Sequence, residues 1–554
     1  PRSDTYIEKD AKINDLIDSL RHAATASLLT RDDVLIVASV SCIYGIGDPE
    51  EYEKVAIELG VGKPLSLRDL ARSLVALQYV KNTYDPRQGN FRMRGETTEI
   101  FLPSGEEKVL VGIEKNKITS LALQKIGGGP NPYPLTPVPS YKLFPAKHFV
   151  TPRAKLKLAL SNIRRELQEQ LEKFKKEGKL LEAQRLGERT NFDLEMLEST
   201  GYVNGIENYS RQLSFRAPGS PPFTLIDYYH YRFGDDFLVI IDESHASIPQ
   251  LRGMYPGDRA RKETLVEYVF RLPSAIDNRP LKFEEFGQKV NRLLFVSATP
   301  SQYELLKSQP HVVEQIIRPT GVLDPNVKMR PTKNQIKDVI AEVKKRITKG
   351  ERSLVMALTK RLAEDISEYL TEAGIKAEYI HSEVKTLDRP DILKKLREGE
   401  HDVLVGINLL REGLDIPEVS FIAILDADKE GYLRNETTLL QIIGRAARHT
   451  DGTVILYADR ATESMRKAMS ETARRRKIQE TYNRTHGITP ATIQKEIRKS
   501  LLEELSPKTE EEFLPAGPTR EMVTALEREM QRAAKGMDFE LAAKIRDRIK
   551  KYRK

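Results

Sequence analysis

The stretch FLVIIDESH, residues 237–245, joins five consecutive apolar residues to a pair of carboxylates, Asp242 and Glu243. An apolar run without alternation indicates a strand buried on both faces, as in a parallel sheet covered by helices. Similar runs occur at 34–40, 293–296, 354–357, 403–405 and 421–425, and helical patterns at 362–369 and 389–396 separate the later ones. This βαβα order predicts an α/β fold with two parallel-sheet units, one on each side of about residue 320.

Three further regions have patterns of their own. Residues 50–145 contain strand-like pieces with turn signals such as Gly89-Asn90, and they predict a separate inserted domain. A long amphipathic helix is predicted by apolar residues at helical spacing, namely Leu156, Leu160, Ile163, Leu167, Leu171 and Phe174. Residues 506–518 are rich in proline and acid, which is typical of a linker, and two short amphipathic helices follow. A helical hairpin of this size has too small a core to be stable alone, so we expect it to pair with another copy or another protein, unless it is a frayed tail.

The composition of the chain narrows the classes of protein to which it can belong. The chain has 554 residues, which is too long for one hydrophobic core, and a net charge of +8. That charge is compatible with nucleic-acid binding or with a solvated surface, although basic residues cluster at 474–477 and 550–554. Cys42 is the only cysteine, so no internal disulfide is expected and a reducing cytoplasm is the predicted location. No apolar stretch is long enough to predict a transmembrane helix.

Several short motifs carry candidate chemistry. Asp242 at the end of a buried strand can hold Mg²⁺ through water, and Glu243 can orient an attacking water. The SATP turn at 297–300 places Ser297 and Thr299 at the end of the next strand, where hydroxyl groups can link neighbouring loops or simply cap a turn. The loop REGLDIP at 411–417 contains Gly413 and Asp415, which suit either a nucleotide contact or an ordinary strand–helix connection.

The segment QIIGRAAR at 441–448 is the strongest local signal. Arg445 and Arg448 are three residues apart, so on a helix both guanidinium groups face one direction. Two converging arginines can neutralise charge that develops on a transferred γ-phosphoryl group. Gln441 completes the motif as a candidate nucleotide contact.

The order of these motifs resembles motifs II to VI of superfamily 2 helicases. That resemblance implies two RecA-like domains that clamp ATP and Mg²⁺ and close across nucleic acid. The phosphate-binding pattern G-x-x-x-x-G-K-[ST] does not occur in the sequence, and GVGKP at 60–64 is the nearest approach. In that segment Pro64 follows Lys63, which removes both the hydroxyl and an amide donor, so poor ATP binding is expected. Because the chain opens on Pro1 in the middle of a pattern, we expect its start to lie upstream.

The match extends beyond helicase motifs. The segments SDTYIEKDAKIND (3–15), VASVSCIYG (37–45), GIENYSR (205–211), PQLRGMY (249–255) and NLLREGLDIP (408–417) together resemble the UvrB family of bacterial nucleotide excision repair. The resemblance runs along the whole chain, without about the first hundred residues of the family. It implies a partial first RecA-like domain with half a β-hairpin (1–51), a UvrA-interaction domain (52–145), a DNA-binding helical part with motifs II and III (146–317), a second RecA-like domain (318–505), a linker (506–518) and a UVR helical hairpin (519–554).

The resemblance also implies roles for individual residues. Tyr6, Glu8 and Lys9 match the returning strand of the hairpin that probes damaged DNA, and an aromatic there can stack on an unpaired base. Further DNA-binding positions are Arg21, Glu207 and Arg211. Arg92 and Arg94 match the arginines that bind UvrA, and alternation along a strand puts both on one face. Phe539 is the expected anchor for UvrC.

The implied function is to receive damaged double-stranded DNA from UvrA, verify the lesion by ATP-driven limited strand opening, and recruit UvrC for incision. A homodimer through the terminal hairpin is an additional expectation. Three alternatives remain at this stage. They are an ATP-independent adaptor between UvrA and UvrC, a processive superfamily 2 helicase, and a transcription–repair coupling factor. The inserted domain and terminal hairpin argue against a processive helicase, since a simple translocase needs neither. In the coupling factor the helicase motifs do not run directly into a UVR hairpin.

Overall fold

The computed structural model describes residues 15–126, 133–381, 389–407, 415–431, 433–493 and 495–496, together with positions 527, 530, 531 and 546. The chain divides into two compact units, the first ending at Val296 and the second running from Ser297 to Pro507. Residues 297–317, which the sequence assigns to the first domain, therefore belong with the second unit. None of the helices in this described part is both long and apolar enough to cross a membrane.

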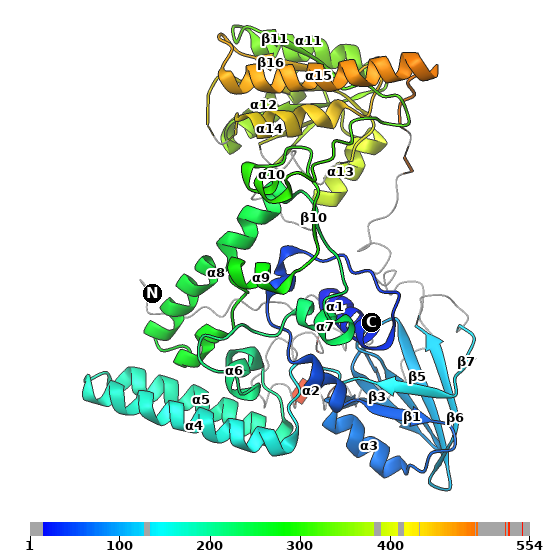
Figure 1. The fold of residues 1–554 in the computed structure, drawn as a ribbon, viewed down its shortest axis with the longest axis vertical. Coiled ribbons are helices and arrows are strands. Elements are labelled where there is room, and N and C mark those ends of the chain that lie inside the picture. The colour runs from blue at the N-terminus through cyan, green and yellow to red at the C-terminus, as the bar shows by residue number, and fades with distance from the viewer. Residues whose placement is uncertain are drawn as a thin grey trace. The chain divides into compact units, whose positions relative to one another are not determined.

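The second unit is drawn from green to orange in Figure 1. It is built on a six-stranded sheet in which every neighbouring pair is parallel. The strand order is β11-β16-β15-β12-β14-β13. The strands are β11 (Asn326–Arg330), β12 (Arg352–Met356), β13 (Ala377–Ile380), β14 (Val403–Gly406), β15 (Val419–Ile424) and β16 (Thr453–Tyr457). The helices are α10 (Gln302–Ser308), α11 (Gln335–Ile347), α12 (Lys360–Glu372), α13 (Arg389–Glu398), α14 (Glu436–Ile443) and α15 (Glu463–His486).

The central strands of this sheet are buried on both faces, as their uninterrupted apolar sequence predicts. In β15, Ile422 and Ile424 pack in the core that contains side chains of α13, α14 and α15. The intervening Phe421 and Ala423 pack in the opposite core, with α11 and α12. Because successive strand residues point to opposite faces, one continuous apolar run supplies both cores. The α/β fold class is thus confirmed.

The inserted domain in the first unit is a six-stranded sheet of order β2-β3-β4-β5-β6-β7, antiparallel apart from the β2–β3 pair. Its strands are β2 (Val80–Lys81), β3 (Asn90–Arg94), β4 (Thr97–Phe101), β5 (Glu107–Glu114), β6 (Lys117–Lys125) and β7 (Thr136–Pro137). A separate antiparallel pair joins β1 (Ile57–Gly60) to β8 (Ser140–Leu143), and α2 (Pro49–Lys54) and α3 (Leu67–Ala76) complete this part. The predicted inserted domain is present.

Helices dominate the rest of the first unit. α4 (Arg153–Lys176) and α5 (Leu180–Thr200) form a hairpin, and the predicted apolar stripe of α4 packs in its core. The other helices are α1 (Asp15–Thr30), α6 (Ser210–Leu213), α7 (Leu225–Phe233), α8 (Ser244–Glu267) and α9 (Phe283–Lys289). Short 3₁₀ turns are η1 (Val40–Ile43), η2 (Ile206–Tyr209) and η3 (Pro273–Asp277), and η4 (Gly444–Ala446) lies in the second unit.

The parallel sheet of the first unit consists, in the described residues, of β9 (Val239–Ile241) and β10 (Leu293–Phe295). The strand expected at 34–40 is wrong, because that segment is irregular and its Leu35 and Val37 are 84% and 91% exposed. A strand needs a neighbouring strand to form hydrogen bonds with its amides and carbonyls. In the described residues β9 and β10 pair with each other, and neither pairs with the segment 34–40. Burial on both faces is also wrong for this pair, since Ile240 and Leu294 are about half exposed, at 56% and 48%.

The double-sided burial of β15 gives a testable difference in stability. We predict that Phe421→Ala lowers the free energy of unfolding by about 3–5 kcal/mol, because it removes a fully buried ring from a packed core. Leu35→Ala, at an exposed apolar position, should change it by less than about 0.5 kcal/mol. Native-state hydrogen exchange of the β12, β14 and β15 amides measures both effects, and equal effects of the two substitutions would contradict this assignment of the core.

Candidate functional site: helicase motifs at the ends of parallel strands

The carboxylate pair follows β9 directly, at the carboxyl end of a parallel strand. The Ser244 N–H donates to the Val296 carbonyl at 3.0 Å, which ties the turn after β9 to the end of β10. The carbonyl of Asp242 accepts a hydrogen bond from the Ser247 hydroxyl at 2.8 Å, while the Asp242 side chain is exposed. An exposed carboxylate held on a fixed backbone fits the water-mediated Mg²⁺ contact expected of Asp242.

Glu243 has an unusual backbone. Its φ of 44° and ψ of 50° lie in the left-handed region, which costs a non-glycine residue free energy and is often found at functional sites. Its Oε2 lies 3.5 Å from Nδ1 of His245. The strained turn sets the backbone of Glu243, and its carboxylate lies against the His245 imidazole.

The segment GVGKP is not a phosphate loop. It forms the turn after β1 in the inserted domain, where the Gly62 N–H donates to the Ile118 carbonyl and the Lys63 N–H to the Gly60 carbonyl. The Lys63 ammonium lies 3.2 Å from Glu58. These amides are already used within the fold, so this segment does not surround a phosphate.

In the second unit the structure joins two of the predicted motifs. Gln441 and Thr299 are both buried, and the Gln441 side-chain amide donates to the Thr299 hydroxyl at 3.0 Å. The Thr299 N–H in turn donates to the Ser297 hydroxyl at 3.0 Å. The SATP turn is thus linked to α14, so the hydroxyl groups do connect neighbouring segments.

The prediction that Arg445 and Arg448 share a helical face is wrong. α14 ends at Ile443, Arg445 lies in η4, and Arg448 follows in a turn. Arg448 instead pairs with Asp415, with Nε and Oδ1 2.5 Å apart, and Lys495 also contacts Asp415 at 2.6 Å. Partial burial raises the pKa of Asp415, but Lys495 and Arg448 outweigh it and lower that pKa overall. The predicted nucleotide residue Asp415 and the predicted catalytic Arg448 therefore meet.

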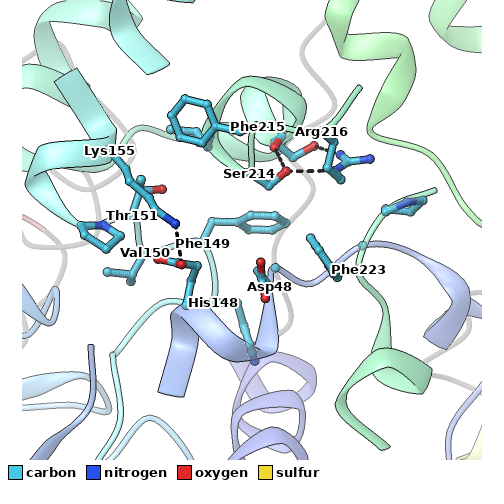
Figure 2. A pocket seen from close by; sticks show the side chains of 17 residues that line it. Asp48, His148, Phe149, Val150, Thr151, Lys155, Ser214, Phe215, Arg216 and Phe223 are labelled. Atoms are coloured by element: carbon cyan, nitrogen blue, oxygen red, sulfur yellow. Dashed lines mark hydrogen bonds and ion pairs between the residues drawn. The ribbon is translucent and has the colours of Figure 1, made fainter. Parts of the chain in front are cut away.

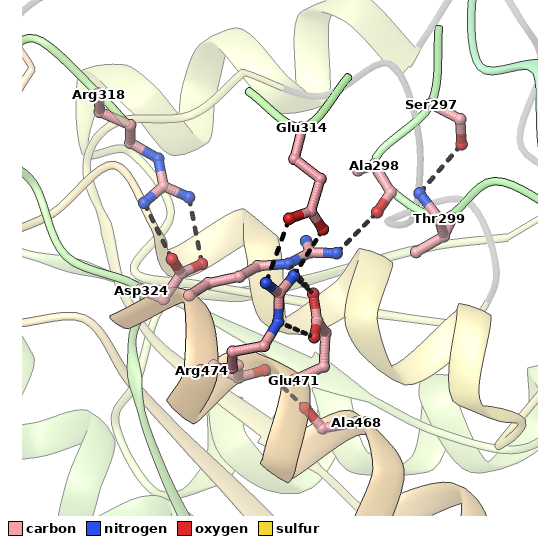
Figure 3. Close-up of polar contacts among 11 residues, drawn as sticks. Ser297, Ala298, Thr299, Glu314, Arg318, Asp324, Ala468, Glu471 and Arg474 are labelled. Atoms are coloured by element: carbon pink, nitrogen blue, oxygen red, sulfur yellow. Dashed lines mark hydrogen bonds and ion pairs between the residues drawn. The ribbon is translucent and has the colours of Figure 1, made fainter. Parts of the chain in front are cut away.

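The basic run at 474–477 is largely engaged inside the second unit rather than free for nucleic acid (Figure 3). Arg474 binds Glu314 at 2.8 Å, Arg475 donates to the Ala298 carbonyl at 2.9 Å, and Arg476 donates to the Asp324 carbonyl at 2.6 Å. Glu471 accepts from both Arg474 and Arg475. These contacts hold residues 297–324 against α15, which explains why that segment belongs to the second unit.

The face of β3 in the inserted domain behaves as the alternation predicts. Phe91 and Met93 pack into the core, and Arg92 and Arg94 lie on the other face. Arg92 binds the carboxylate of Glu99 at 2.7 Å, whereas Arg94 is exposed. Arg94 is therefore the better placed of the two to reach a partner.

The predicted DNA-binding residues differ in how accessible they are. Arg21 is exposed on α1 and Glu207 is half-buried in η2. Arg211 is mostly buried and contacts Asp277 at 3.1 Å and Glu166 at 3.5 Å, so binding a phosphate would require breaking these pairs. Outside the described residues lie Tyr6, Glu8, Lys9, Gly413, Phe539 and the UVR hairpin.

A pocket in the first unit was not anticipated from the sequence (Figure 2). Phe149 and Arg216 line it, and Lys155 at its rim donates to Glu51 at 2.6 Å. Burial raises the pKa of Asp48 in its wall. The lining comes from separate segments near 45–51, 148–155 and 210–223. Since these segments share no motif, no local sequence signal could have found the pocket.

A two-faced parallel sheet with helicase motifs at its strand ends defines a RecA-like, helicase-type protein, and the residues 334–450 match the model of the helicase conserved C-terminal domain. Four other family models match, namely the UvrB interaction domain (57–149), the UvrB third helical domain (154–215), ultra-violet resistance protein B (456–498) and the UvrB/uvrC motif (520–554).

Curated relatives agree with these models. The chain is 55% identical to UvrABC system protein B of Geobacillus kaustophilus (strain HTA426) and to that of Bacillus caldotenax, over 99% of this chain and 83% of each relative. It is 52% identical to UvrABC system protein B of Gloeothece citriformis, over 100% of this chain and 84% of the relative. The chain belongs to the UvrB family of the UvrABC excision repair system.

The ion-pair cluster on α15 predicts a specific pH dependence. Hydrogen bonds from Arg474, with a further contribution from Arg475, outweigh partial burial and lower the pKa of Glu471 from 4.5 to about 2. A depressed pKa stabilises the fold above the ordinary value, and that stabilisation is lost as the pH falls from 4.5 towards 2. Glu471→Gln should therefore reduce the loss of unfolding free energy between about pH 5 and pH 3 in urea titrations of the full chain. Equal losses in the variant and the unsubstituted chain would show that Arg474 and Arg475 do not lower the pKa of Glu471 in the folded state.

Proposed function

We propose that this chain receives damaged DNA from UvrA, verifies the lesion by limited ATP-dependent strand opening, and recruits UvrC for incision. Family membership supports the general role, and the observation that carries the catalytic part is the strained turn at Glu243 beside the exposed Asp242 carboxylate. Strained backbone of this kind is often found at functional sites, and it fits a carboxylate that acts on a water molecule.

The residues divide the work of ATP hydrolysis. Asp242 would hold Mg²⁺ through water, and the bound ion would neutralise charge on the β- and γ-phosphates. Glu243 would polarise the hydrolytic water, while Arg445 and Arg448 would stabilise charge on the transferred phosphoryl group. Gln441, Gly413 and Asp415 would contact the nucleotide. The hydrogen bond between Gln441 and Thr299 would couple a movement of α14 to a movement of the SATP turn.

A second candidate is an ATP-independent adaptor between UvrA and UvrC. The absence of a G-x-x-x-x-G-K-[ST] pattern in this sequence favours it, because the amides and lysine of that loop supply much of the binding energy for the phosphates. The two candidates agree on the partners and differ in whether nucleotide is used.

The chain as given should hydrolyse ATP poorly, and DNA-stimulated hydrolysis should appear when a segment carrying a G-x-x-x-x-G-K-[ST] loop is joined to it. In the extended chain, Glu243→Gln should lower the rate by at least about 100-fold, since it removes the base that orients the water. Steady-state phosphate release measures both, with Lys467→Gln on the surface of α15 as the matched control. Hydrolysis in neither version would favour the adaptor, and full activity in the chain as given would mean that the nucleotide site is misplaced.

Docking to UvrA should depend on Arg94 more cleanly than on Arg92. Arg94→Ala should weaken UvrA binding at least about five-fold without changing thermal stability, because its side chain is exposed. Arg92→Ala should also lower stability, since it leaves Glu99 without its closest cation. Surface plasmon resonance with immobilised UvrA, together with thermal melts, separates the effects. Arg72→Ala on α3 is the control, and normal UvrA binding by Arg94→Ala would refute the docking role of this face.

A further inference from the structure

Three side chains in the first unit bring metal-binding atoms together at a place that the helicase motifs do not involve. Asp18 and His22 lie one turn apart on α1, and His148 comes from the segment between β8 and α4. One ligand atom from each of the three lies within 4.8 Å of the others. A spacing of four residues places Asp18 and His22 on one face of the helix, which is how helical metal ligands are commonly arranged.

The buried imidazole of His22 has one nitrogen without a hydrogen bond. Only 3% of His22 is exposed, and its Nε2 has no hydrogen-bond partner among the residues that the structure describes. Its Nδ1 lies 3.3 Å from the Tyr52 hydroxyl, which donates its own proton to the Pro145 carbonyl. We therefore assign the Nδ1–H tautomer, in which Nδ1 donates to Tyr52 and the lone pair is on Nε2.

The carboxylate of Asp18 lies near this nitrogen. The distance from Nε2 of His22 to Oδ2 of Asp18 is 3.9 Å, too long for a hydrogen bond and close to the separation of two ligands on one metal ion. A buried nitrogen without a partner is costly, whereas a cation placed between the two atoms would satisfy both.

Neighbouring hydroxyl groups position both imidazole rings. Nε2 of His148 lies 3.2 Å from the Thr25 hydroxyl. The hydrogen bond from Nδ1 of His22 to Tyr52 is of the kind that orients ligating histidines in metal sites.

We propose that Asp18, His22 and His148 bind one divalent transition-metal ion, with Zn²⁺ as the best fit to two imidazoles and one carboxylate. Tetrahedral ligands with bonds of roughly 2.1 Å are about 3.4 Å apart, so the cluster must contract by about 1 Å on binding. The half-exposed Asp18 side chain can make most of that movement, and the stacked rings of His22 and His148, whose centroids are 3.8 Å apart, must tilt away from each other.

The ion would tie α1 to the segment that leads into α4. Arg21, the predicted DNA contact, immediately precedes His22 on α1, and His148 also lines the pocket of Figure 2. Bound metal would therefore fix the orientation of α1 relative to this pocket. Since three protein ligands leave a fourth position for water, binding should be reversible by a chelator.

The test is a Zn²⁺ titration of the full chain, prepared without a polyhistidine tag and stripped with a chelator. Isothermal titration calorimetry measures stoichiometry and affinity, and the visible spectrum of added Co²⁺ reports the coordination. The variants are Asp18→Asn, His22→Gln and His148→Gln. The matched control is His486→Gln, which removes an exposed histidine on α15.

One ion per chain is expected, with each of the three variants binding at least about ten-fold more weakly and the control unchanged. Asp18→Asn keeps the test decisive if a buried histidine variant fails to fold, because the Asp18 side chain is 28% exposed. Absence of stoichiometric binding, or binding that Asp18→Asn and the histidine variants leave unchanged, would overturn the proposal.

Discussion

Burial of the parallel sheet on both faces is the constraint on which the second unit depends. Parallel strands need crossover helices, and these helices cover both faces, so polar residues can gather only where the strands end. That is where the helicase motifs lie. Arg448 meets Asp415 after β14, and Gln441 meets Thr299 at the start of the unit. The buried apolar strands thus determine where polar functional residues can lie in this unit.

The ion pairs on α15 extend this constraint to a segment with no regular strand. Residues 297–324 contain only the short helix α10, yet Arg474, Arg475 and Arg476 fasten them to α15 through carboxylates and backbone carbonyls. A run of like charges is usually a solvated face, but here each guanidinium has an acceptor. The SATP turn therefore belongs physically to the unit that carries Gln441 and Arg448.

Sequence patterns predicted the parts of the fold that local physics determines. The strands at 354–357, 403–405 and 421–425 and the long helix α4 were found, because burial on two faces or one helical stripe leaves a clear apolar pattern. The predicted strand at 34–40 was wrong because a strand depends on hydrogen bonds to a neighbouring strand, and a local apolar pattern does not show whether that neighbour is present. The shared helical face of Arg445 and Arg448 was wrong because α14 ends at Ile443. The sequence signal of the cluster of Asp18, His22 and His148 is only the four-residue spacing between Asp18 and His22, because His148 lies far along the chain.

The most direct test of the central claim is incision of a duplex carrying one lesion by UvrA and UvrC of a Bacillus relative. This chain, joined to a segment carrying a G-x-x-x-x-G-K-[ST] loop, would be the only member of the UvrB family present. We expect incision that requires the chain and is lost with Glu243→Gln while UvrA binding is kept. Incision that is equally efficient with Glu243→Gln, or no incision with the extended chain despite normal UvrA binding, would contradict it.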